Sequence, residues 1–250
     1  MKPIIQTVKT KFSELVNKHN LGSQRVQVTV KTLSPKQAIG SPGRNDFPIL
    51  LGKEVIVEAQ FDESFGQSFT DRPQSFNGTI DELLNLNLDS SSNRAIFIAS
   101  LNAITAHLGI ASGTRHCRDE EPEKCALQIA KDLKQRFGDI KIGLIGLQPA
   151  ILQNLGQSFG AENVACTDLN PNNVGSRKFG IEIWSGAKDT DKLINQCDLI
   201  LVTSSSLTNG TFDNINIAAT AANKPIILFG ITGAGICALT GLERICFYGH

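Results

Sequence analysis

The chain has 250 residues, of which 41% are hydrophobic and 19% are charged, with 24 basic and 24 acidic side chains. This length accommodates one large domain or two modest ones with adequate hydrophobic cores. The balanced charge, without a cluster of Lys and Arg interleaved with aromatic residues, disfavours nucleic acid as a partner.

The N-terminal residues lack the long apolar core of a signal peptide. No apolar run approaches the roughly 18–20 residues needed to span a bilayer, so we expect no membrane association. The six cysteines include no CxxC pair, and four of them lie in or beside apolar strand or helix patterns. Such placement is typical of reduced, buried thiols. We therefore expect a cytoplasmic protein.

The first part of the chain predicts a helix, two strands and two irregular stretches. Apolar residues recur at helical spacing over 4–18. Alternating apolar and polar residues then predict strands over 26–30 and 55–61. A Pro- and Gly-bearing loop, residues 34–52, separates the strands. Residues 62–78 form a second irregular stretch, which is long enough to be a candidate binding loop.

Two helices are expected next. Thr79, followed by Glu82, predicts the start of a short helix over 79–86. Residues 94–108 form a helix that is apolar almost all round and is therefore expected to be buried. Asn102 interrupts this apolar helix, and a buried amide must find partners. These partners are backbone groups or, if the helix faces the carboxyl ends of a parallel sheet, a ligand.

From Pro122 the pattern changes to strands alternating with helices, which predicts a parallel, doubly wound sheet. The strands read as continuous apolar runs, as expected when both faces of a sheet are covered. The expected helices are 122–137, 149–158, 189–196 and 212–222, and the expected strands are 140–146, 163–168, 198–203 and 225–230. We place a boundary between an α+β domain, residues 1–112, and an α/β domain, residues 113–250.

Ligands of doubly wound sheets bind outside the carboxyl ends of the strands. After the first such strand come Gly146 and Gln148, and only one glycine of the dinucleotide fingerprint is present, so classical NAD binding is weakly supported. Asp168 and Asn170 follow the second strand. An acidic residue there suits the hydroxyls of a ribose, but the same residues also suit an Asx turn.

The third strand ends in the densest group of hydroxyls in the chain, residues 203–211. Thr203, Ser204 and Asn209 belong to this loop, which leads into the N-terminus of a helix. Hydroxyls and backbone N–H groups in that position suit a carboxylate or phosphate. The alternative is a polar loop whose last threonine caps the helix.

His116 and Cys117 lie at the domain boundary and belong to no apolar stripe. Imidazole nitrogen and thiolate are good ligands for zinc, copper(I) or nickel. Arg115 and Arg118 are expected to lower the pKa of the thiol, although the same arginines would also suit an anion. Cys125 lies on the apolar face of the following helix and is expected in the core.

Three short motifs resemble a bacterial and archaeal family known as the heavy-metal chelation domain: Gly143 to Gly146, Asp168 to Pro171 with Gly175, and Leu207 to Thr211. Residues 95–109, with Asn102 and Ala103, resemble the companion N-terminal domain. The resemblance implies an N-terminal domain similar to that of enolase, a Rossmann-like C-terminal domain, a site between them, and a role in metal handling.

We therefore expect a protein that binds a transition metal ion, or a small metal-chelating or anionic metabolite, in a cleft between two domains. His116 and Cys117 would approach a metal, and the remaining contacts would come from Asn102, Gly146, Gln148, Asp168, Asn170, Thr203, Ser204 and Asn209. The alternative is an enzyme that uses a nucleotide-type cofactor, S-adenosylmethionine or a dinucleotide, or that acts on a phosphorylated or carboxylated metabolite. A homodimer is expected from the frequency of such assemblies.

Overall fold

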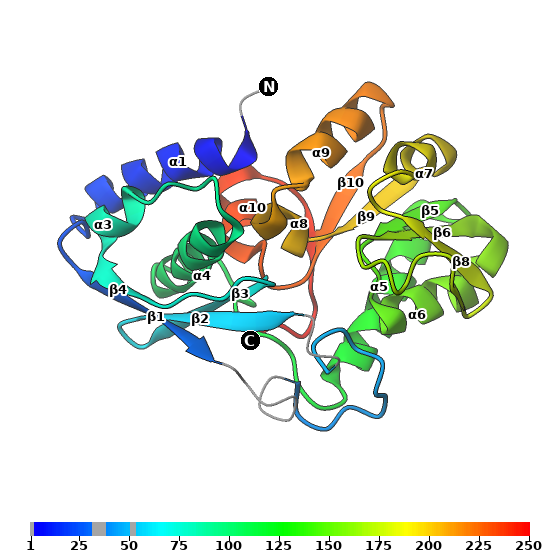
Figure 1. Ribbon diagram of the computed structural model, residues 1–250, viewed down its shortest axis with the longest axis horizontal. Helices are drawn as coiled ribbons and strands as arrows, with labels where there is room; N and C mark the ends of the chain where they lie inside the picture. Colours follow the sequence, from blue (N-terminus) through cyan, green and yellow to red (C-terminus); the bar gives the residue numbers. More distant parts are fainter. Residues whose placement is uncertain (1–2, 32–38, 51–53) are drawn as a thin grey trace.

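The computed structural model describes residues 3–31, 39–50 and 54–250. It has a mixed α/β architecture with two sheets, one four-stranded and antiparallel and one seven-stranded and mostly parallel (Figure 1). The predicted loop over 34–52 lies partly outside the described residues, at 34–38 and 51–52. Among the described helices, none is both long and apolar enough to cross a bilayer.

The first sheet has the strand order β3-β2-β1-β4. Its strands are β1 (Arg25–Lys31), β2 (Val55–Phe61), β3 (Ser64–Thr70) and β4 (Phe76–Thr79). Helix α1 (Ile4–Lys18) buries Ile5, Val8, Phe12 and Val16. The predictions of helix 4–18 and of strands over 26–30 and 55–61 are confirmed.

The prediction that residues 62–78 form a long irregular binding loop is wrong. Two strands, β3 and β4, occupy most of this stretch. β3 pairs with β2 along its whole length through a two-residue turn at Asp62 and Glu63. The sequence of β3 lacks the alternating apolar pattern of a strand, because it contains Ser, Gly and Gln. These small and polar residues are buried against a helix rather than exposed to solvent.

Helices α3 (Ile80–Leu84) and α4 (Ser91–His107) follow. At the start of α3, Thr79 accepts a hydrogen bond from the backbone of Glu82, whose side chain accepts one from the backbone of Thr79, so the predicted capping box is confirmed. Helix α4 is buried from Ala95 to Thr105, as expected from its apolar sequence. It packs on β2 and β3 on one side and on α8 and α10 of the second half on the other (Figure 1).

The second sheet has the strand order β11-β10-β9-β5-β6-β8-β7, and every neighbouring pair is parallel except β7 and β8. The strands are β5 (Ile142–Ile145), β6 (Val164–Asp168), β7 (Arg177–Lys178), β8 (Ile181–Ser185), β9 (Leu199–Thr203), β10 (Ile226–Phe229) and β11 (Arg244–Ile245). The chain builds the sheet outward from β5 through β6 to β8, and then from β9 on the other side. The order therefore reverses between β5 and β9, which is where doubly wound sheets open a crevice for ligands.

Helices cover both faces of this sheet. They are α5 (Glu121–Phe137), α6 (Pro149–Phe159), α7 (Thr190–Gln196), α8 (Ser205–Asn209), α9 (Phe212–Ala221) and α10 (Ala234–Thr240), with a short 3-10 turn at Ala161–Asn163. Ile142 and Leu144 face the α5 and α6 side, whereas Ile200 and Val202 belong to the core on the α7 and α9 side. All four predicted helices and all four predicted strands from residue 122 onward are present, with ends shifted by at most three residues.

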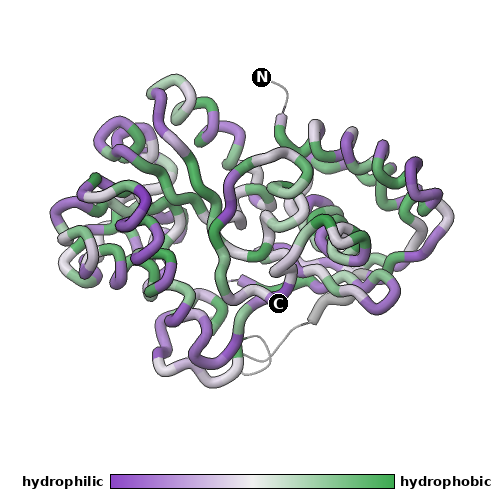
Figure 2. The backbone as a smooth tube through the Cα atoms, turned by 180° about the vertical axis from the view of Figure 1, so that it is seen from behind, coloured by the Kyte–Doolittle hydropathy of each residue, from purple (hydrophilic) through white to green (hydrophobic). Residues whose placement is uncertain are grey.

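The two halves of the chain share their hydrophobic cores. One cluster of buried residues contains Val8 and Phe97 from the first half together with Leu193 and Leu228 from the second. A second cluster joins Ile56 of β2 to residues of α5, α6 and the parallel sheet. Figure 2 shows the corresponding green, apolar stretches of backbone at the centre of both lobes and where they meet. The domain boundary between residues 112 and 113 stays a prediction.

Candidate functional site

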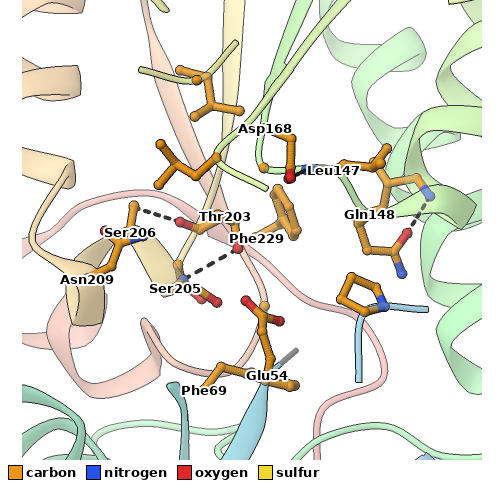
Figure 3. A pocket seen from close by; sticks show the side chains of 18 of the residues that line it. Glu54, Phe69, Leu147, Gln148, Asp168, Thr203, Ser205, Ser206, Asn209 and Phe229 are labelled. Atoms are coloured by element: carbon orange, nitrogen blue, oxygen red, sulfur yellow. Dashed lines mark hydrogen bonds between the residues drawn. The ribbon is translucent and has the colours of Figure 1, made fainter. Parts of the chain in front are cut away.

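A cavity of about 1110 Å³ lies at the carboxyl ends of the parallel strands. The ends of β5, β6, β9 and β10 contribute to its wall, and the end of β3 lies opposite them. Figure 3 shows this arrangement, with Asp168, Thr203 and Phe229 across the cavity from Glu54 and Phe69. The crevice expected at the reversal of strand order is therefore formed, and it is closed on the other side by residues of the first half of the chain.

Nine of the ten residues predicted to form the site line this one cavity. They are Gly146, Gln148, Asp168, Asn170, Thr203, Ser204, Asn209, His116 and Cys117. Their convergence follows from the parallel sheet, which brings loops distant in sequence to one edge. Some of these side chains form hydrogen bonds within the protein and so have structural roles. His116 keeps a buried polar atom without a partner in the described residues, and that atom can contact a ligand.

The tenth residue, Asn102, does not line the cavity. Its side-chain amide is fully buried and donates to the backbone carbonyls of Gln67, Ile231 and Thr232 at 2.9, 3.2 and 3.2 Å. Its oxygen accepts the N–H of Gly235 at 2.7 Å. The expectation of a ligand contact is therefore corrected, because every polar atom of the side chain is used to join β3 to the loop that precedes α10.

Asp168 organises the turn after β5. One carboxylate oxygen accepts the N–H of Leu147 at 2.8 Å, and the other accepts the N–H of Asn170 at 2.8 Å and the Asn173 amide at 3.0 Å. The Asx turn considered for this segment is thus present. Because Asp168 holds the Leu147 N–H, this donor of the β5–α6 turn faces a carboxylate of the chain itself. A phosphate at that turn would meet a negative charge.

Gly146 is required by packing as well as by backbone conformation. Its φ is +90°, and a Cβ atom there would lie 2.4 Å from Cγ2 of Thr203. β5 and β9 are neighbouring strands, so the side chain of Thr203 fills the space above Gly146. Gln148 caps α6, since its side-chain oxygen accepts the N–H of Ile151 at 2.7 Å.

The loop after β9 is more regular than expected, because Ser205–Asn209 form helix α8. The Ser206 hydroxyl donates to the carbonyl of Thr203 at 2.6 Å (Figure 3). Asn209 accepts from both the N–H and the hydroxyl of Thr211 at 3.0 and 2.8 Å. Thr211 precedes α9 but makes no side-chain cap bond to it. Several hydroxyls of this segment therefore stabilise the loop itself.

Carboxyl groups dominate the charged lining of the cavity. Four carboxylate side chains line the cavity: Glu54, Asp71, Asp168 and Asp191. Among the lining residues that the structure describes, there is no Lys or Arg. Burial raises the pKa of Glu54 from 4.5 to about 7, and the negative charges of Asp168 and Asp71 add to this rise. Glu54, which the sequence did not single out, is therefore a carboxyl group of the cavity whose charge changes near neutral pH.

His116 and Cys117 have a different electrostatic environment from the one expected. Burial lowers the pKa of His116 to about 4 and raises the pKa of Cys117 to about 12. The expectation that arginines stabilise a Cys117 thiolate is therefore wrong. The Arg115 guanidinium instead pairs with buried Glu58 at 3.4 Å and lies over the Phe65 ring. Both site residues are neutral at physiological pH.

Two buried polar atoms of the lining have no hydrogen-bond partner among the described residues: Nδ1 of His116 and the hydroxyl of Thr167. The backbone N–H of His116 is held by Gln67 at 2.7 Å, and its ring lies edge-on to Phe69. Buried polar groups are nearly always paired, so these two atoms are the natural contact points for a ligand.

A second group of sulfur atoms lies at the same cavity. Cys125, at the first turns of α5, and Cys246, directly after β11, both line it, as does Cys117. Cys125 is buried in the core as expected, and it also lines the cavity beside Cys246. The neighbouring Cys125 thiol, together with Arg244, lowers the pKa of Cys246. Within the described ranges, no group of three or more His, Cys, Asp and Glu side chains is arranged to hold a metal ion.

The comparisons with known proteins agree with the resemblance of the sequence. Residues 130–240 match the model of the family DUF364, described as "Putative heavy-metal chelation". No curated protein matches the sequence. The solved structures similar to this chain include a protein of unknown function from the DUF364 family of Pyrococcus horikoshii, with 19% identity and a TM-score of 0.51, covering 92% of this chain and 79% of that chain. Another DUF364 protein of unknown function, from Desulfitobacterium hafniense DCB-2, has 13% identity and a TM-score of 0.49, covering 74% of this chain and 72% of that chain.

The similarity to the P. horikoshii protein supports the mixed α/β fold. The match over residues 130–240 contains α6, β6 and β9, whose ends form one wall of the cavity. The resemblance drawn from the sequence motifs is thereby confirmed, since residues 130–240 match the model of the DUF364 family.

Proposed function

We propose that the cavity binds a metal cation that arrives in a complex with a small chelating molecule. The observation that carries this proposal is the set of carboxyl groups around the cavity, which has no basic counterpart among the described lining residues. A cation in this environment is attracted by Asp168 and Asp71 and relieves the charge repulsion that raises the pKa of Glu54. The family description supports a role in metal chelation at the level of the family.

The size of the cavity favours a complex over a bare ion. Six water molecules around a metal ion occupy roughly 180 Å³, at about 30 Å³ each. The cavity is about 1110 Å³, several times larger and within the order of size of pockets for small organic ligands. The described residues also present no group of three or more side chains placed to hold a metal ion. Ligands from a small molecule would supply the missing coordination.

Two unpaired polar atoms give such a complex its attachment points. Neutral His116 offers Nδ1 either as an acceptor or as a donor, depending on the tautomer, and Thr167 offers a hydroxyl. Direct coordination by His116 and Cys117, as expected from the sequence, remains part of the proposal. If replacing both residues left metal affinity unchanged, direct coordination by this pair would be ruled out.

The proposal is tested by isothermal titration calorimetry with nickel(II) chloride and with the neutral bis(histidinato)nickel(II) complex. Glu54→Gln removes the titratable carboxyl group that shares the cavity with Asp168 and Asp71, and we expect about tenfold weaker binding, which corresponds to about 1.4 kcal/mol. Glu63→Gln, which changes an exposed glutamate in the β2–β3 turn, serves as the matched control. Equal affinities of all three proteins would contradict the proposal.

A second candidate function is an enzyme that uses S-adenosylmethionine or a dinucleotide. It is favoured by the position of the cavity at the reversal of strand order and by Asp168 at the end of β6. Against it, Asp168 already holds the Leu147 N–H, and the space at Gly146 is filled by Thr203. Thermal shift with S-adenosylmethionine, NAD and ATP separates the two functions, because an enzyme of this class would be stabilised by one of these compounds.

We also propose that the chain has two domains and forms a homodimer. Residues 1–112 would form a domain similar to the N-terminal domain of enolase, and residues 113–250 a Rossmann-like domain. The strand order of the parallel sheet supports the second assignment. The protein would act as a homodimer in metal homeostasis in the cytoplasm. Sedimentation equilibrium tests the dimer, and a mass equal to the single chain of 27.0 kDa would exclude it.

A further inference from the structure

Three cysteines that are distant in sequence line one part of the cavity. Cys117 comes from the segment before α5, Cys125 from the start of α5, and Cys246 from the segment after β11. The other three cysteines, Cys166, Cys197 and Cys237, do not line it. The fold therefore concentrates half of the thiols of the chain at the proposed binding cavity.

Cys125 and Cys246 are neighbours at this cavity, since each thiol is the largest influence on the pKa of the other, and Cys117 acts electrostatically on both. The segment that carries Cys246 is held in place by backbone pairing. The N–H of Arg115 donates to the carbonyl of His250 at 2.8 Å, and the N–H of His250 donates to the carbonyl of Arg115 at 3.0 Å. The C-terminal segment thus lies against the segment that carries Cys117.

The surroundings of this thiol pair are apolar, with one fixed positive charge. Ile129 and Ile245 line the cavity beside the pair. The guanidinium of Arg244 lowers the pKa of Cys246 and is held by the carbonyls of Ser112 and Gly230 at 2.7 and 3.2 Å. An apolar wall disfavours a hard, hydrated ion, whereas sulfur ligands select soft ions such as copper(I).

We propose that Cys125 and Cys246 form a two-coordinate site for a soft monovalent cation of the copper(I) or silver(I) type, with Cys117 as a third thiol beside it. The inference rests on the proposed cation-binding function of the cavity and names a class of ion for it. Soft monovalent ions accept two sulfur ligands in a linear arrangement, so a third protein ligand is not required. Replacing the two thiol protons by one monovalent ion leaves a single negative charge, which the guanidinium of Arg244 balances.

The site is tested by anaerobic titration of the fully reduced protein with copper(I) in competition with bicinchoninate. We expect one tightly bound copper(I), accompanied by a sulfur-to-copper charge-transfer absorption in the ultraviolet. Cys125→Ser and Cys246→Ser should each weaken binding by at least about 100-fold, because loss of a residue that only supports a metal ligand already costs about 10- to 100-fold and here one of two ligands is lost. Cys197→Ser is the matched control, since Cys197 is buried like Cys125 but lies outside the cavity.

Unchanged copper(I) affinity in the folded double variant Cys125→Ser/Cys246→Ser would overturn the inference, and so would an equal loss in Cys197→Ser. If the variants do not fold, the wild-type chain provides the test. Silver(I) should protect Cys125 and Cys246 from iodoacetamide, as mapped by mass spectrometry of peptides. Alkylation of both residues at the same rate with and without silver(I) would exclude the site.

The outcome is separable from the proposed function of the cavity. Glu54→Gln should weaken the nickel complex and leave copper(I) affinity unchanged, because Glu54 is absent from the groups that interact with either thiol. The two serine variants should show the reverse pattern. Loss of the nickel complex with retained copper(I) binding would contradict the carboxylate proposal alone, and the opposite result would contradict the thiol site alone.

Discussion

The acid–base chemistry of Glu54 is set by the tertiary structure. A glutamate beside a strand reads as an ordinary surface residue in the sequence. In the folded chain it lines the same cavity as Asp168 and Asp71, from β6 and from the end of β3, and both carboxylates act on it electrostatically. Figure 3 shows Asp168 across the cavity from Glu54. Burial and these two neighbours favour its neutral form. It can therefore exchange a proton for a cation near neutral pH.

Glu54 also makes stability depend on pH. In the unfolded chain its pKa is near 4.5, whereas in the folded chain it is about 7. Between these values the folded state holds a proton that the unfolded state has released, so rising pH lowers stability across this interval. We expect Glu54→Gln to raise Tm relative to wild type above pH 7 and to leave it nearly unchanged below pH 4.5. Thermal melts across this range check the prediction, and a constant difference in Tm would contradict it.

For the cysteines, the sequence predicted where the side chains lie better than it predicted their protonation state. The apolar periodicity of residues 122–137 correctly placed Cys125 in the core, and His116 and Cys117, which the sequence singled out, line the cavity. The predicted charge state of Cys117 was wrong, because the side chains of residues close in sequence can point in different directions. Arg115 is paired with Glu58, and burial dominates the pKa of the thiol.

At the scale of elements, helix signals and the strands of the parallel sheet were predictable because periodicity and continuous apolar runs are local properties. Strand β3 could not be predicted from the sequence, because its burial depends on contact with α4 rather than on its own composition. The β7–β8 hairpin was also missed. Its turn contains Phe179 with a φ of +53°, a conformation that a phenylalanine gives no reason to expect.

The packing of β3 on α4 requires a residue without a side chain at position 66. A Cβ atom on Gly66 would lie 2.2 Å from the backbone nitrogen of Ala103 and 2.4 Å from the carbonyl oxygen of Ala99. Both are backbone atoms of a buried helix and cannot move aside. We expect Gly66→Ala to destabilise the fold by about 3 kcal/mol, the upper end of typical overpacking costs. Urea unfolding measures this value, and a loss below about 0.5 kcal/mol would contradict this packing.

The capping box of α3 is expected to have a smaller, local effect. Thr79 and Glu82 satisfy two backbone N–H groups at the start of the helix. Thr79→Ala removes one of these bonds at an exposed site, and we expect a loss of about 1 kcal/mol. Thr7→Ala is a control in which a threonine hydroxyl bonds to the carbonyl of Pro3, four residues earlier, and caps no backbone N–H. Equal stability of the Thr79 and Thr7 variants in urea unfolding would exclude a contribution from the cap.

At the scale of the whole molecule, the two halves of the chain are joined through α4. Figure 1 shows this helix between the antiparallel sheet and helices α8 and α10. Asn102 of α4 bonds to β3 and to the loop before α10. Sequence reasoning identified this asparagine as unusual but could not choose between backbone and ligand, because the choice depends on which groups the other half of the chain presents.

Asn102→Ala tests this connection. The substitution leaves four buried backbone groups without their partner, and we expect a loss of roughly 3 kcal/mol or more. Because the two halves share their cores, wild type should unfold in one transition, followed by both tryptophan fluorescence and circular dichroism. Separate transitions in wild type would show that the two halves fold independently.

The central claim is that the cavity at the edge of the parallel sheet takes a metal cation in a small-molecule complex. The most direct measurement is the dissociation constant of bis(histidinato)nickel(II), obtained by calorimetry for wild type, Glu54→Gln and Glu63→Gln. We predict binding to wild type and Glu63→Gln with equal affinity and about tenfold weaker binding to Glu54→Gln. Absence of binding to wild type, or stabilisation of the protein by phosphate or ATP instead, would contradict the claim.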